Sequence, residues 1–158
     1  MGSRRVTDIL FTLALFCVFA ASALIVVYIG ADVYRSTVDR AEEDFRLNTT
    51  LSFVSTKIRQ HDNYGAIRIE QFGGSNALVL EQPIGENIFE TWIYFYNGTL
   101  RELFTNQANA ATMSPSAGQV LLNVFSFDVE QPHDSIIAIT AGSSHDVSFS
   151  KLVGIRSN

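Results

Sequence analysis

The sequence predicts an α+β protein in which a long N-terminal helix, first transmembrane and then amphipathic, packs on a C-terminal antiparallel β-sheet. An uncharged apolar run extends from Ile9 to Gly30, apolar residues then keep helical spacing to about Gln60, and alternating apolar and polar residues follow Gly65. We therefore divide the chain into a cytoplasmic tail with a transmembrane helix, 1–30, and an extracytoplasmic domain, 31–158. Within that domain we expect helix at 31–60 and sheet at 65–156.

The apolar run is long enough to cross a bilayer. A hydrocarbon core of about 30 Å needs about 20 apolar residues in a helix, whereas the apolar region of a signal peptide has about 7 to 15. Ala21-Ser22-Ala23 is a site that a signal peptidase could accept, but the apolar run continues beyond it to Ile29. We expect a retained single-pass anchor. The alternative is a secreted soluble domain that begins near Leu24.

Charges on the two sides of the run predict its orientation. Arg4 and Arg5 precede the run, while the segment 32–46 is rich in acidic residues. Short basic segments stay on the cytoplasmic side of a membrane. We therefore expect a cell-membrane protein with a cytoplasmic N-terminus and an extracytoplasmic C-terminal domain.

Beyond the run, apolar residues recur on two helical stripes. The first stripe is Tyr34, Val38, Ala41 and Phe45, and the second is Leu47, Leu51, Val54 and Ile58. The polar residues 61–65 predict the end of the helix. We expect the stripes to cover one face of the sheet, and a membrane-proximal coiled coil is the alternative.

The remaining chain alternates between apolar and polar residues in short segments. The expected strands are 67–69, 77–81, 89–96, 99–104, 120–129, 135–141 and 147–155. Asn97-Gly98 is typical of a two-residue type I′ turn, and 106–117 is expected to be a loop. Short turns between neighbouring strands predict antiparallel pairing.

Four stretches carry a family resemblance. Phe11-Thr12-Leu13 is similar to the first residues of a processed pilin, and NTTLSFVSTKIRQHDN (48–63) to the end of the long helix in minor pilins of competence and secretion systems. WIYFYNGTLRELF (92–104) and LLNVFSFDVE (121–130) resemble the following hairpin and strand. The chain thus resembles the type IV pilin and minor pseudopilin family, and also an uncharacterised clostridial family of single-pass proteins encoded beside pilin-like genes.

This resemblance implies a pilin-like fold and a non-catalytic, membrane-anchored subunit. Such a subunit contributes to the assembly of a type IV pilus, competence or secretion-type filament, and its partners are other pilin-like subunits or copies of itself. The small residues 20–23 give a surface for close helix packing in lipid.

The sequence departs from the family's pattern at two positions. Leu10 stands where the prepilin peptidase site has a glycine, and Leu15 stands where most members have a glutamate that pairs with a neighbour's amino terminus. The resemblance therefore supports the fold more strongly than incorporation into a filament. The alternative function is a solitary single-pass anchored binding or sensor domain, with its ligand on the sheet or in the 106–117 loop.

Composition and motifs argue against several other functions. The chain has 11 Lys plus Arg against 16 Asp plus Glu, and its positive charges are scattered, so no nucleic-acid partner is expected. Its one cysteine, Cys17, lies in the apolar run, which excludes an intrachain disulfide. No catalytic, cofactor-binding or metal-site motif occurs. We expect a protein that is not an enzyme, with no catalytic, cofactor or metal site.

Two patterns could nevertheless carry chemistry. Each histidine is followed by an aspartate, at 61–62, 133–134 and 145–146, and converging turns could bind zinc. Such polar pairs are typical of ordinary turns, which is the preferred interpretation. Trp92, Tyr94 and Tyr96 lie on one strand face and could stack a ligand. Packing in a core or interface is preferred for them, because cross-strand aromatic residues stabilise sheets.

Overall fold

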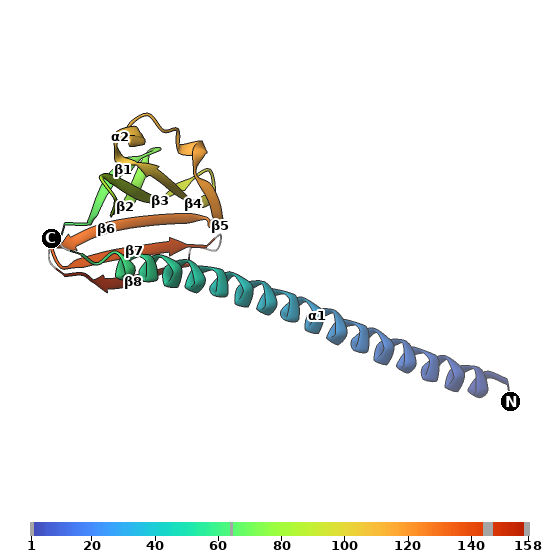
Figure 1. Cartoon of the computed structure of the whole chain (residues 1–158). Helices are drawn as coiled ribbons and strands as arrows, with labels where there is room; N and C mark the ends of the chain where they lie inside the picture. The colour runs from blue at the N-terminus through green and yellow to red at the C-terminus, as the bar shows by residue number, and fades with distance from the viewer. Residues whose placement is uncertain (1, 64, 144–146, 157–158) are drawn as a thin grey trace. The chain divides into compact units, whose positions relative to one another are not determined.

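A computed structural model gives the fold of the chain (Figure 1). It describes residues 2–63, 65–143 and 147–156, with the side chains of residues 2–5 excepted. The chain divides into two compact units, Met1–Glu42 and Glu43–Asn158. A long N-terminal helix followed by antiparallel β-structure confirms the predicted α+β class.

The helix α1 extends over Gly2–Gln60. Among the described residues it is the one helix long and apolar enough to cross a membrane. Its large apolar side chains between Ile9 and Ile29 are exposed. This suits a membrane-spanning helix, which satisfies its backbone hydrogen bonds internally and turns apolar side chains toward lipid. The predicted end at Gln60 is confirmed. His61 N–H makes the last helical hydrogen bond, to the Lys57 carbonyl at 3.2 Å, and Asn63 N–H then donates to the His61 carbonyl in a turn.

Eight strands lie in the described part of the chain and form two antiparallel sheets (Figure 1). The larger sheet, in the order β1-β2-β3-β4-β5, consists of β1 (Ile67–Phe72), β2 (Ser75–Ile84), β3 (Asn87–Tyr96), β4 (Thr99–Asn106) and β5 (Gln119–Asn123). The smaller sheet consists of β6 (Ser126–His133), β7 (Ile136–Gly142) and β8 (Ser148–Gly154). The expected single sheet over 65–156 is therefore two sheets.

The predicted β3–β4 hairpin is confirmed. Asn97 has φ 49° and Gly98 has φ 73°, the positive angles that a type I′ turn requires at both central residues. Tyr96 pairs with Thr99 across the turn. Asn97 is the one described residue other than glycine with a positive φ. The sequence pair therefore fixes this hairpin locally.

The predicted strand at 120–129 is wrong, because the chain leaves one sheet and enters the other inside it. β5 ends at Asn123 and β6 begins at Ser126. Between them, Val124 N–H donates to the Gly98 carbonyl at 3.1 Å and its side chain is buried, whereas Phe125 is 65% exposed. Two adjacent apolar residues, Val124 and Phe125, break the alternation at this link, and only Val124 is buried, which marks the change of sheet. The expected 106–117 loop likewise contains α2 (Gln107–Ala110) and the 3₁₀ turn η1 (Pro115–Ala117).

The main core of the second unit lies between the end of α1 and the two sheets. Leu47, Leu51, Val54 and Ile58 contribute the second helical stripe, and each is at most 4% exposed. They belong to one buried cluster with side chains from both sheets, including Leu78, Ile93, Val129, Ile137, Ile139 and Val153. Burying these large apolar side chains supplies the main favourable term for folding.

The expectation that the first stripe also covers the sheet is wrong for Phe45, the member of that stripe that lies in the second unit. Phe45 is 71% exposed, and Tyr34 and Val38 are 71% and 43% exposed. At about 100° per residue, Phe45 points about 200° away from Leu47, so the two stripes cannot both face the same core.

Candidate functional site

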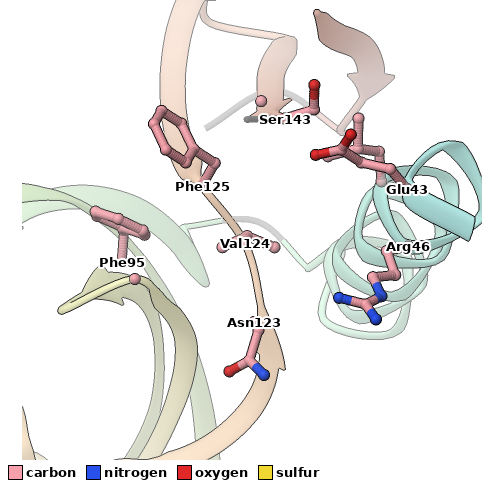
Figure 2. A pocket seen from close by; sticks show the side chains of 10 residues that line it. Glu43, Arg46, Phe95, Asn123, Val124, Phe125 and Ser143 are labelled. Carbon is pink, nitrogen blue, oxygen red and sulfur yellow. The ribbon is translucent and has the colours of Figure 1, made fainter. Parts of the chain in front are cut away.

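A groove with a volume of about 520 Å³ opens in the second unit where five segments meet (Figure 2). These segments are the part of α1 that begins the unit, the end of β3, the β3–β4 turn, the β5–β6 link and the end of β7. The lining residues are Glu43, Arg46, Leu47, Phe95, Gly98, Asn123, Val124, Phe125, Gly142 and Ser143.

The groove is apolar with polar groups at its margin. Leu47 and Val124 are buried, and Phe125 is exposed beside them. Figure 2 shows Glu43 and Arg46 on α1, on the opposite side of the 123–125 segment from Phe95. Its polar lining groups are the side chains of Glu43, Arg46, Asn123 and Ser143. Its volume and its mixed lining suit the binding of an amphipathic segment or molecule.

The aromatic residues Trp92, Tyr94 and Tyr96 lie on the opposite face of the larger sheet from the main core. Trp92 is 6% exposed and Tyr94 is fully buried. The Phe72 ring lies 5.2 Å from the Trp92 ring and 4.8 Å from the Tyr94 ring, edge-on in the second case. A second buried cluster forms around them with Ala77, Val79, Leu103 and Ala110. Core packing is confirmed for Trp92 and Tyr94, which have no open face left for stacking a ligand, and Tyr96 is half-buried against the same cluster.

The segment 107–118 covers this aromatic cluster and is held by hydrogen bonds. Tyr94 Oη donates to the Pro115 carbonyl at 2.7 Å, and Arg101 Nη1 donates to the Ser116 and Gly118 carbonyls at 3.0 Å each. Burial raises the pKa of Tyr94 above its usual value, although a backbone hydrogen bond with Gly118 and the charge of Arg101 act against the rise. The second possible ligand-binding element, the 106–117 loop, is thus a structural cover.

Gly118 is required by the close approach of this cover to Tyr94. A Cβ at Gly118 would lie 2.3 Å from Tyr94 Oη and 3.2 Å from the Glu102 carbonyl oxygen. We expect Gly118→Ala to displace the Tyr94–Pro115 hydrogen bond and to lower the free energy of unfolding by about 1–3 kcal/mol. Urea unfolding followed by Trp92 fluorescence measures this. Gly154→Ala is the control, because its Cβ would meet nothing closer than the Ser135 carbonyl at 4.0 Å, and equal losses in the two variants would contradict the expectation.

A charged cluster borders the same face of the sheet. The Arg68 guanidinium pairs with Glu70 and Glu81, and Arg68 Nη2 lies 2.7 Å from Glu90 Oε1. The Glu90 side chain is fully buried, and its second oxygen accepts a hydrogen bond from Trp92 Nε1 at 2.8 Å. Burial by itself would lower the pKa of Arg68, but hydrogen bonds and charge from Glu70 and Glu90 outweigh it and raise the pKa.

The Arg68 cluster therefore ties three strands to the aromatic cluster. Arg68 and Glu70 come from β1, Glu81 from β2, and Glu90 from β3, where Glu81 and Glu90 are register partners. The sequence gives no direct sign of this cluster. Arg68 and Glu70, two residues apart on one strand, are the part of it that lies close together in sequence. Glu81 and Glu90 join them only through the pairing of β1 with β2 and of β2 with β3.

The histidine–aspartate pairs do not form a common site in the described residues. His61 Nδ1 lies 3.0 Å from the Lys57 carbonyl oxygen, and Asp62 Oδ1 accepts the Arg156 N–H at 2.7 Å. His133 Nδ1 lies 3.0 Å from Ser135 Oγ in the β6–β7 turn. The third pair, 145–146, lies outside the described residues. Over the part of the chain that the structure describes, no group of three or more His, Cys, Asp or Glu side chains is placed to hold a metal ion.

Comparison with known proteins places the second unit in a family. A family model described as a domain of unknown function (DUF4860) matches residues 45–144, from the last turns of α1 to the segment after β7. No curated protein and no solved structure matches the chain. Since the matched range is more than half of the sequence and includes the buried helical stripe, the larger sheet and all groove-lining residues except Glu43, the chain belongs to the DUF4860 family.

Proposed function

We propose that this chain is a non-catalytic, membrane-anchored, pilin-like subunit that contributes to the assembly of a type IV pilus, competence or secretion-type filament. The observation that carries the proposal is the construction of α1. The helix is apolar and exposed between Ile9 and Ile29, and its last turns place Leu47, Leu51, Val54 and Ile58 in the core of a β-domain. The helix α1 is continuous over Gly2–Gln60, so one element carries both the apolar stem and part of the domain core.

The apolar stem supports association in the bilayer. Every large apolar side chain from Ile9 to Ile29 is more than half exposed, so lipid or other helices must cover this surface. Ala20, Ala21, Ser22 and Ala23 allow close helix packing there. The domain lies outside the cell in this proposal, with the N-terminus in the cytoplasm, because Arg4 and Arg5 precede the span.

The chemistry of the domain supports a role in association over one in catalysis. The groove combines apolar side chains with Glu43 and Arg46, and the Arg68 cluster joins strands. Both places are built from side chains that suit packing and ion pairing between surfaces.

Two measurements on the protein in its native membrane test the proposal. The intact mass is expected to be that of a chain that keeps the apolar run. A photoreactive amino acid at Leu24 is expected to link the stem to pilin-like proteins or to further copies of this chain, while the same group at exposed Ser150 serves as the control. A mature chain that begins near Leu24, or recovery of monomer alone from the Leu24 position, would contradict the proposal.

The groove favours a second candidate function, a solitary anchored binding or sensor domain. Its volume of about 520 Å³ falls in the range of small-molecule sites, and its lining is mostly apolar. Native mass spectrometry of the purified full-length protein is expected to retain a bound molecule if this second function is correct. Phe125→Ala removes the exposed aromatic side chain at the groove and should then reduce the retained fraction. A chain with no bound mass, linked to pilin-like partners through its stem, favours the first function.

A further inference from the structure

The β2–β3 hairpin projects beyond its neighbours in the larger sheet. On the β1 side, pairing ends at Glu81, whose N–H donates to the Ala66 carbonyl at 2.7 Å. On the β4 side, pairing ends where Phe89 faces Asn106. Residues 82–88 therefore form a two-stranded ribbon, with no further strand beside it in the described part of the chain. A ribbon of this kind is only marginally stable unless a contact covers its side chains.

The ribbon presents apolar side chains on both of its faces. Ile84 is 45% exposed and Ile88 is 41% exposed. They lie on opposite faces, because Ile84 pairs with Asn87 and Ile88 is the next residue along β3. Pro83, the register partner of Ile88, is also exposed. Exposed apolar side chains gathered on a projection indicate a surface that another molecule covers.

The groove of Figure 2 is a surface on this chain that suits the ribbon. Its volume of about 520 Å³ can take a compact projection, and Leu47, Val124 and Phe125 give it an apolar lining. Ribbon and groove lie toward opposite ends of β3, since Ile88 and the groove residue Phe95 are seven residues apart, or about 24 Å along a strand. A chain therefore cannot fill its own groove with its own ribbon.

The charges of the two surfaces are complementary. Glu86 is the one charged residue of the ribbon, and it is exposed at the turn. Arg46 is exposed as well and lines both the groove and an adjoining hollow of about 250 Å³ over β5, whereas Glu43 lines the groove alone. A carboxylate that approaches Arg46 from the β5 side meets the guanidinium and stays away from Glu43. Because like charges that meet across an interface cost energy, this arrangement sets the direction of seating.

We propose that the β2–β3 ribbon of one copy of this chain seats in the groove of a second copy, with Glu86 paired to Arg46. A contact between two unlike surfaces builds a ring or an open filament, not a closed pair. The inference rests on the proposed function and deepens it, because it names a contact between β-domains for the assembly. Such a contact is small and weak alone, and stems held in one bilayer support it by raising the local concentration of the domains.

Photo-crosslinking of the full-length protein in its native membrane tests the contact. A photoreactive amino acid at Ile88 is expected to give a product of twice the chain mass, in which the linked peptide contains residues 123–125 or 43–47. Leu152 is the matched control, because it is apolar, 66% exposed and part of the other sheet. We expect at least about fivefold more dimer from Ile88 than from Leu152. Equal yields, a link outside the groove or a link to another protein overturns the proposal.

Exchanging the two charges tests the pairing. Glu86→Arg and Arg46→Glu are each expected to lower the yield of Ile88-linked dimer about fivefold, and the double variant is expected to restore it to within about twofold. An unchanged urea midpoint of Trp92 fluorescence checks that each variant is folded. Glu43→Gln, which removes the like charge from the groove without any exchange, is expected to raise the yield. A double variant no better than the single ones, or a lower yield from Glu43→Gln, overturns the pairing.

Failure of this contact is distinguishable from failure of the proposed function. A stem that links to pilin-like partners from Leu24, while Ile88 gives monomer alone, overturns the ribbon contact and leaves the proposed function standing. A groove link from Ile88 together with monomer alone from Leu24 overturns association through the stem and leaves the ribbon contact standing.

Discussion

Replacing Val54 with aspartate is expected to unfold the second unit. Val54 is fully buried in the core that α1 shares with both sheets. A carboxylate there loses its hydration without gaining a partner, and we expect a loss of more than about 4 kcal/mol in the free energy of unfolding. The measurement is the disappearance of the cooperative transition of Trp92 fluorescence during urea titration of the full-length protein in detergent.

Ser52→Asp is the matched control for this substitution. Ser52 lies two residues earlier on the same helix and is exposed, so the same new carboxylate should change the free energy of unfolding by no more than about 0.5 kcal/mol. If the two variants lose the same free energy of unfolding, the last turns of α1 do not form part of the core. The observation that carries the proposed function is then lost.

Removing the buried carboxylate of Glu90 should give the second large loss of stability. Glu90→Ala leaves the Trp92 N–H without its acceptor and takes from Arg68 its one fully buried partner, since Glu70 and Glu81 are partly exposed. We expect a loss of about 2–4 kcal/mol, measured from the urea midpoint and slope. A change in the emission maximum of Trp92, the single tryptophan, should accompany it.

Glu70→Ala controls for the loss of a negative charge beside Arg68. The Glu70 side chain is 41% exposed, so its ion pair is screened by solvent and should contribute no more than about 1 kcal/mol. A loss at Glu70 as large as that at Glu90 would show that burial does not set the strength of these pairs.

Local signals predicted several elements correctly. Asn97-Gly98 adopts the positive φ angles of the expected turn, and α1 ends at Gln60 before the polar segment that was expected to stop it. The stripe from Leu47 to Ile58 is buried as expected. In each case the decisive interactions lie within a few residues of the signal, either in backbone conformation or in side chains on one helical face.

Errors arose where two arrangements share one pattern. The apolar-rich segment from Val120 to Val129 is consistent with one long strand and with two strands in different sheets. The adjacent apolar residues Val124 and Phe125 break the alternation, but the sequence does not say which of them turns to the core. In the last strand, Leu152 and Val153 are both apolar, yet Leu152 is 66% exposed and Val153 is buried. A shift of one residue in register exchanges the two faces of a strand, and the sequence of the strand does not fix that register.

The candidate sites depended on tertiary structure more than the fold class did. The groove joins segments from Glu43 to Ser143, and the Arg68 cluster joins three strands. The aromatic side chains of β3 were visible in the sequence, but their role depended on whether something covers them. The cover is the 107–118 segment, whose hydrogen bonds to Tyr94 and Arg101 join residues that the sequence does not bring together.

The sequence by itself determined the apolar run, the helical stripes, the hairpin turn and the class of the fold, because these follow from periodicity and backbone preference over short distances. Only the tertiary structure decided that the strands form two sheets, that one helical stripe is buried while the other stays uncovered, and that a groove opens at the start of the second unit. Those outcomes depend on which distant surfaces exclude water together, and burial is a property of the assembled chain.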